Sequence, residues 1–137
     1  MFKYLFLSMV LGWGSSLMAQ KECSLGIGVS NMDTVEQVFQ LNAAQKEQLQ
    51  TFHEAVGVET KLLEEERKEL FKSHPQTTPE DFETLEAKRL ALENKVKAVF
   101  TKYDRKFLAL LNEKQYQRYL ALCREVERQP IKKPGDN

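Results

Sequence analysis

Apolar residues recur at steps of three and four along most of this chain, which is the spacing of one face of an α-helix. Two long stripes stand out, one between Asn42 and Ser73 and one between Thr78 and Leu111. The first consists of Leu49, Phe52, Val56, Leu63 and Leu70. The second consists of Phe82, Leu85, Leu92, Val96, Val99, Tyr103 and Leu110. Proline is absent from residues 33–74 and 80–129, so long uninterrupted helices are predicted.

Four helix starts can be identified from capping residues. A side-chain oxygen at the cap accepts a hydrogen bond from a free backbone N–H, and the residue three positions later can reach back to the cap. The cap and its partner are Asp33 with Glu36, Asn42 with Gln45, Thr78 with Asp81, and Asn112 with Gln115. The first helix is expected to end near Gln40. Residues 73–77 form the turn between the two long helices.

An all-α fold follows from these patterns. Each long helix has about 31 residues and would span roughly 46 Å at 1.5 Å per residue. The expected shape is an elongated hairpin of two long helices, with short N-terminal and C-terminal helices folded against it. Such a shape leaves apolar surface uncovered, which predicts a homodimer or a partner surface. Gly57 lies inside the first long helix and marks either a bend or a close helix contact.

The start of the chain has the layout of a secretory signal peptide. Lys3 provides a positive start, an apolar run follows, and small residues lead to Ala19. We expect residues 1–19 to be removed, with cleavage after Ser16 as the alternative. Large polar residues precede Cys23, so no lipid anchor is expected there, and the exported protein should not insert into a membrane. Residues 20–32 are predicted to be a flexible arm, 33–129 the helical domain, and 130–137 a disordered tail.

Cys23 and Cys123 remain after removal of the signal peptide. In an oxidising compartment the two can form a disulfide within one chain. Two alternatives stay open. In the first, the thiols are unpaired and Cys123 is a small buried apolar residue. In the second, the N-terminal arm forms a disulfide bridge to a second molecule.

Charge is balanced overall, with Lys+Arg and Asp+Glu both at 20. This balance gives no reason to expect nucleic acid as a partner. The charge is nevertheless uneven, because acids dominate residues 54–69 and bases dominate residues 88–106. Either the two long helices attract each other across a solvated face, or the basic part of the second long helix faces a binding surface.

No pattern of catalytic residues is present, so we expect neither an enzyme nor a cofactor. Two histidines and two cysteines are poor material for a dedicated metal site. The aromatic residues are more informative, because Phe100 lies next to the apolar stripe and among cations. An apolar ring among mobile cations can hold unfolded chains weakly. The candidate residues for such binding are Arg89, Lys95, Lys97, Phe100 and Lys102.

Two helix starts carry a resemblance to a known family. Leu41-Asn42-Ala43-Ala44-Gln45 and Leu111-Asn112-Glu113-Lys114-Gln115 resemble the paired L-T-x-x-Q motifs of the Spy/CpxP family of periplasmic proteins. Asn replaces Thr in both copies and caps a helix at least as well. The cysteine pair is not part of the family pattern, and the strongly basic surface of Spy is muted here.

The resemblance implies a cradle-like helical homodimer in the periplasm. Family members act as ATP-independent chaperones, or they damp a sensor kinase of the envelope stress response. The first hypothesis is therefore a holdase for unfolded or partly folded envelope proteins. The alternatives are a regulator that binds the periplasmic domain of a sensor kinase, and a metal-binding stress protein.

Overall fold

A computed structural model describes residues 21–135, and within that range the secondary structure consists of four α-helices. They are α1 (Met32–Phe39), α2 (Ala43–Ser73), α3 (Pro79–Leu110) and α4 (Glu113–Glu125). The all-α prediction is confirmed for these residues. The predicted signal peptide, residues 1–19, lies outside the described residues.

Local capping chemistry sets the helix starts. Asn42, Thr78 and Asn112 each accept a hydrogen bond from the backbone of the residue three positions later, whose side chain bonds back to the cap. The first start differs from the prediction, because Asn31 rather than Asp33 caps α1 by accepting from the Thr34 N–H. Asn31 lies two residues earlier and supplies the same kind of oxygen, so α1 begins at Met32.

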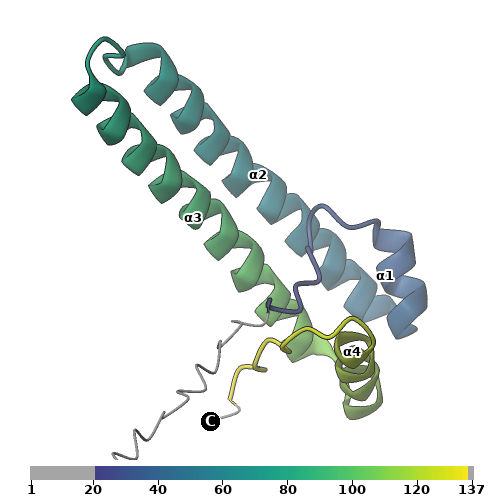
Figure 1. The fold of residues 1–137 in the computed structure, drawn as a ribbon. Coiled ribbons are helices and arrows are strands. Elements are labelled where there is room, and N and C mark those ends of the chain that lie inside the picture. Colours follow the sequence, from purple (N-terminus) through teal and green to yellow (C-terminus); the bar gives the residue numbers. More distant parts are fainter. Residues whose placement is uncertain (1–20, 136–137) are drawn as a thin grey trace, which may run out of the picture.

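The two long helices run antiparallel side by side and account for most of the length of the molecule (Figure 1). α1 and α4 lie together at one end, beside the start of α2 and the end of α3 (Figure 1). We call this end the base, and the end that carries the α2–α3 turn the tip. No helix among the described residues is long and apolar enough to cross a membrane.

The main hydrophobic core lies at the base. Phe107, Leu108 and Tyr119 are fully buried there, and the Phe39 and Phe107 rings meet edge to face with centroids 5.6 Å apart. Nearer the tip, Leu85 and Leu92 are buried between α2 and α3 but lie outside this core cluster. Residues 21–135 therefore form a densely packed base and a distal part in which α2 and α3 are the only helices.

Both segments that flank the helices are packed, in contrast to the predicted flexible arm and disordered tail. Ile27 and Ile131 are each only 1% exposed. The backbones of Glu22 and Gln129 form a parallel bridge, in which the Cys23 N–H donates to the Gln129 carbonyl at 2.7 Å. The prediction was wrong for the described parts of these segments because their contacts join opposite ends of the chain, and no local periodicity encodes such contacts.

Candidate functional site: an apolar groove beside a fastened base

A groove of about 540 Å³ lies between α2 and α3 on the distal side of the base. Its apolar walls come from Leu63, Leu92, Val96 and Phe100. Leu63, Leu92 and Val96 belong to the predicted apolar stripes and Phe100 lies next to one, so side chains that join the two helices also form the groove. With only two helices in this part of the described chain, one side of that seam stays open to solvent.

Gly57 forms part of the groove. A Cβ atom added at Gly57 would meet nothing within 4 Å, and α2 continues through this position without a break. The sequence left two interpretations for Gly57, a bend and a close helix contact, and the structure has no close contact at this position. The missing side chain instead widens the groove where α2 would otherwise narrow it.

Both acidic and basic side chains line the groove, but the acidic ones are in ion pairs and two of the basic ones are not. The carboxylate of Glu64 accepts two hydrogen bonds of 2.8 Å from the Arg67 guanidinium, which hold the pKa of Glu64 below its usual value. Glu93 is paired with Arg89. Lys61 and Lys97 take part in none of the ion pairs among the described residues. The charge left for a partner is therefore positive.

The structure divides the five residues proposed for client binding. Lys97 and Phe100 line the groove. Arg89 is held on its own helix by Glu86 and Glu93, and these carboxylates raise its pKa further. Lys95 and Lys102 form ion pairs with acids of α2.

Ion pairs across the seam involve Lys95 with Glu66 at 3.4 Å, and Lys102 with Glu59 at 2.6 Å. The hydrogen bonds from Lys102 and then from the Tyr103 hydroxyl lower the pKa of the Glu59 carboxyl. For these two lysines, attraction between antiparallel helices explains the uneven charge. Lys97 is the member of the basic set that remains available beside Phe100.

The paired motifs meet at the base in a reciprocal amide pair. The Gln45 amide nitrogen donates to the Gln115 side-chain oxygen at 2.8 Å, and the Gln115 nitrogen donates back at 3.0 Å. The second N–H of Gln45 reaches the Leu110 carbonyl, and that of Gln115 reaches the Phe39 carbonyl. Each side-chain oxygen also accepts the N–H of its own cap residue, Asn42 or Asn112. Every donor and acceptor of the two amides is satisfied.

The other motif residues complete this junction. Leu41 and Leu111 are buried at 6% and 3% exposure, next to the caps Asn42 and Asn112. Each copy of the motif therefore combines a buried leucine, a helix cap and an amide shared with the other copy, at the starts of α2 and α4. The arrangement is structural, and it lies away from the groove.

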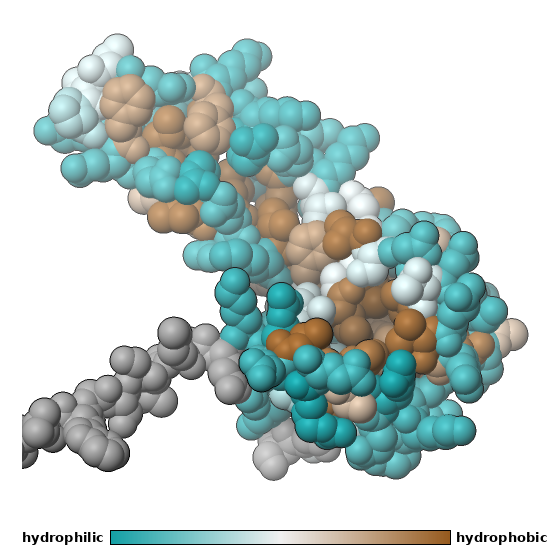
Figure 2. Space-filling model, turned by 45° about the vertical axis from the view of Figure 1, so that its right-hand side comes forward, coloured by the Kyte–Doolittle hydropathy of each residue, from teal (hydrophilic) through white to brown (hydrophobic). Residues whose placement is uncertain are grey.

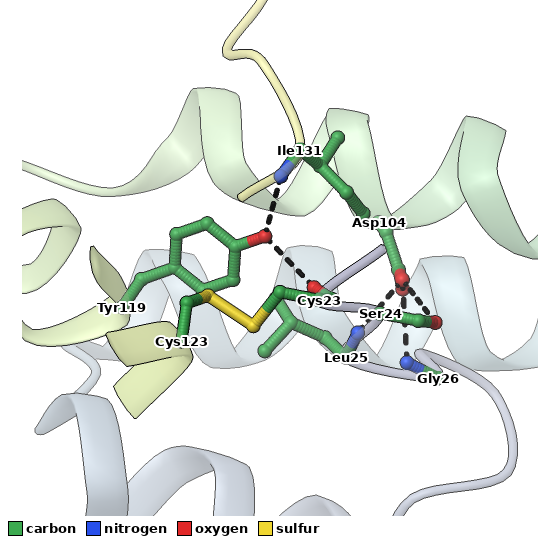
Figure 3. Close-up of a disulfide and its surroundings, with 8 residues drawn as sticks. All are labelled: Cys23, Ser24, Leu25, Gly26, Asp104, Tyr119, Cys123 and Ile131. Carbon is green, nitrogen blue, oxygen red and sulfur yellow. Dashed lines mark hydrogen bonds between the residues drawn. A yellow bond between two sulfur atoms is a disulfide. The ribbon is translucent and has the colours of Figure 1, made fainter. Parts of the chain in front are cut away.

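A disulfide joins Cys23 to Cys123 with a Cα–Cα distance of 5.7 Å (Figure 3). Of the three arrangements that the sequence left open, the structure has the bridge within one chain. Tyr119 lies beside it, where its hydroxyl donates to the Cys23 carbonyl and accepts from the Ile131 N–H. Burial raises the pKa of Tyr119 to about 12. The arm and the tail are thus tied to α4 and to each other.

Asp104 fastens the arm to α3. Its fully buried carboxylate accepts hydrogen bonds from the Ser24 hydroxyl and from the backbone N–H groups of residues 25–27 (Figure 3 shows all but the last). Such charge-assisted bonds are roughly twice as strong as neutral ones. Sequence reasoning missed this role, because Asp104 appears there as one acid within a basic stretch. The available signal was its helical spacing from the apolar residues Phe107 and Leu108, which places Asp104 on the same face as these two.

The described residues contain no group of three His, Cys, Asp or Glu side chains placed to hold a metal ion. In comparisons with known proteins, no family model, no curated protein and no solved structure matches this chain. A functional interpretation therefore depends on the groove and its chemistry.

Proposed function

We propose that this protein is an ATP-independent holdase of the Spy/CpxP type, which binds unfolded or partly folded envelope proteins in the periplasm. The observation that carries this proposal is the apolar groove with free cations at its edge. Phe100, Val96 and Leu63 offer apolar contact, and Lys61 and Lys97 attract acidic chains from a distance. A shallow surface of this kind binds many sequences weakly, as a holdase must.

Exposed apolar side chains on α2 support the homodimer that belongs to this proposal. Val58 is 62% exposed and Leu62 is 61% exposed, and neither lines the groove. A second copy that covers them would turn two elongated helical hairpins into a cradle-like dimer. Sedimentation equilibrium would then give the dimer mass for the wild type and a lower mass for Leu62→Glu. A monomeric wild type at micromolar concentration would refute the dimer.

The holdase proposal is tested by light scattering from a chemically denatured model protein, diluted with and without the mature chain. We expect suppressed aggregation without ATP, and weaker suppression at moderate salt because exposed charges are screened. Phe100→Ser should reduce the effect. Phe82→Ser is the matched control, because Phe82 is 52% exposed near the tip and does not line the groove. No suppression at several-fold excess of wild-type chain would refute the holdase function.

A further inference from the structure

The chain already binds a polypeptide segment on the face that carries the groove. Ile27 of the arm is 1% exposed, and Gly28 lies so close to α2 that an added Cβ would come within 2.4 Å of a Val56 methyl group. The backbone of the arm donates its N–H groups to Asp104 on α3. The surface next to the groove is therefore an interface for a segment with little regular structure.

The groove continues this interface toward the tip. Val56 contacts the arm, and Thr60, one turn further along the same face of α2, lines the groove. On α3, Asp104 binds the arm and Phe100, one turn away on the same face, lines the groove. Figure 2 shows apolar surface that continues from the base along the two long helices, bordered by hydrophilic side chains. The arm covers the part of this face nearest the base, and the groove is the part that no described segment of the chain covers.

We propose that the groove binds an extended apolar segment of another polypeptide that carries carboxylates beside its apolar residues, placed end to end with the arm. This inference rests on the proposed holdase function and specifies its ligand. A volume of about 540 Å³ is within the usual range of about 300–1,000 Å³ for ligand clefts, and it holds a few side chains rather than a folded domain. Carboxylates are specified because Lys61 and Lys97 are the unpaired charges, whereas Glu64 and Glu93 are already neutralised by arginines.

Gly57 offers a direct way to block the groove. A leucine there meets no atom of the protein at its Cβ and improves the helix propensity of α2, so Gly57→Leu should fold while its side chain fills the space. Gln48→Leu is the matched control, because it adds an exposed leucine to the same helix at a position outside the groove. Circular dichroism of both variants verifies that the helices are intact.

The probes are two fluorescein-labelled peptides with the same short Leu-Val core, one flanked by Asp and the other by Lys. Fluorescence anisotropy at low salt should show the Asp-flanked peptide bound about fivefold more tightly, the difference expected for an exposed ion pair. Gly57→Leu should weaken its binding about tenfold or more, as expected for lost burial of one or two apolar side chains. Gln48→Leu should leave its binding unchanged.

A second variant tests the charge preference without risk to the fold. Lys97 is exposed, so Lys97→Glu should abolish or reverse the preference for the Asp-flanked peptide. Lys114→Glu makes the same change of charge on an exposed residue of α4 and should keep the preference.

The outcomes separate the two proposals. Suppressed aggregation together with peptide binding that Gly57→Leu does not weaken would leave the holdase function standing and overturn the groove as its site. Equal binding of both peptides would overturn the acidic preference. Peptide binding that follows the expected pattern in a chain that does not suppress aggregation would support the groove and refute the holdase function.

Discussion

Replacement of Gln115 by methionine is the sharpest test of how the base is held. Gln115→Met keeps the length and the helix propensity of the side chain but removes its amide. The change breaks both bonds to Gln45 and leaves the buried Phe39 carbonyl without its 3.0 Å donor. The Asn112 N–H also loses its capping partner, although solvent can reach that group more easily.

The expected loss follows from the number of buried groups left unsatisfied. A buried polar group without a partner costs about 1–3 kcal/mol, whereas an exposed one costs little. Gln115→Met leaves one N–H of the Gln45 amide and the Phe39 carbonyl in this condition, so the free energy of unfolding should fall by about 2–4 kcal/mol. In a domain of this size that loss corresponds to a decrease in melting temperature of roughly 10–20 °C.

Urea denaturation followed by circular dichroism, with the disulfide intact, measures the difference. Gln117→Met is the matched control, because Gln117 is exposed on the same helix and bonds only to Glu113, one turn away. Its effect should stay below about 0.5 kcal/mol. The double variant with Gln45→Met should cost less than the sum of the two single variants, since the amides lose each other only once. Equal effects of Gln115→Met and Gln117→Met would refute the reasoning.

Four further predictions concern the arm and its surroundings. Asp104→Asn replaces a carboxylate that accepts four hydrogen bonds by a group with one acceptor, so stability should fall by about 2–4 kcal/mol and the amides of the arm should exchange faster by mass spectrometry. The double variant Cys23→Ser with Cys123→Ser opens a link across 100 residues and should lower the free energy of unfolding by about 3–5 kcal/mol in urea titrations. Phenolate absorbance should show Tyr119 ionising with a pKa of about 12, and stability should fall as pH rises from about 10 to that value, because the unfolded chain loses this proton first. Gly28→Ala should lower the melting temperature, because the residue has φ +106° and no room for a Cβ beside Val56.

Each of these predictions has a result that contradicts it. Unchanged exchange in the arm of Asp104→Asn would mean that the disulfide and the other contacts of the arm hold it without the carboxylate. Identical urea midpoints for the wild type and the double serine variant would remove the disulfide from the list of stabilising contacts. An ordinary tyrosine titration would contradict the burial of Tyr119, and a Gly28→Ala variant as stable as the wild type would show that the arm can shift away from α2.

The helix starts were predictable because capping is a local property. Asn42, Thr78 and Asn112 each carry the full information for their helix within four residues, and the structure has all three capping boxes. The paired motifs predicted the capping role of their glutamines but not the contact between them. Gln45 and Gln115 were expected to reach back to their caps, but their contact with each other joins residues 70 positions apart and depends on how the helices meet.

The candidate site was less predictable for the same physical reason. The apolar stripe contains Leu92 and Val96, but a stripe does not state which of its residues a third element will cover. Lys97 and Lys102 lie in the same basic stretch of the sequence and cannot be told apart there. Only Lys102 lies close enough to Glu59 to form an ion pair, and Lys97 forms none among the described residues. Gly57 was visible in the sequence as the one glycine of a long predicted helix, but its role depends on the empty space around it in the folded protein.

The base and the distal helices are stabilised in different ways, and the difference explains how the groove can stay open. The base is held by the disulfide, the shared amides of Gln45 and Gln115, and the buried carboxylate of Asp104, all of which are directional. Toward the tip, buried Leu85 and Leu92 and the two ion pairs across the seam hold α2 against α3. Uncovered apolar surface costs roughly 25 cal/mol per Å², which favours collapse onto any available segment. The arm is the nearest such segment, and its bonds to Asp104 and Cys123 keep it at the base, so the groove stays free for a segment from another chain.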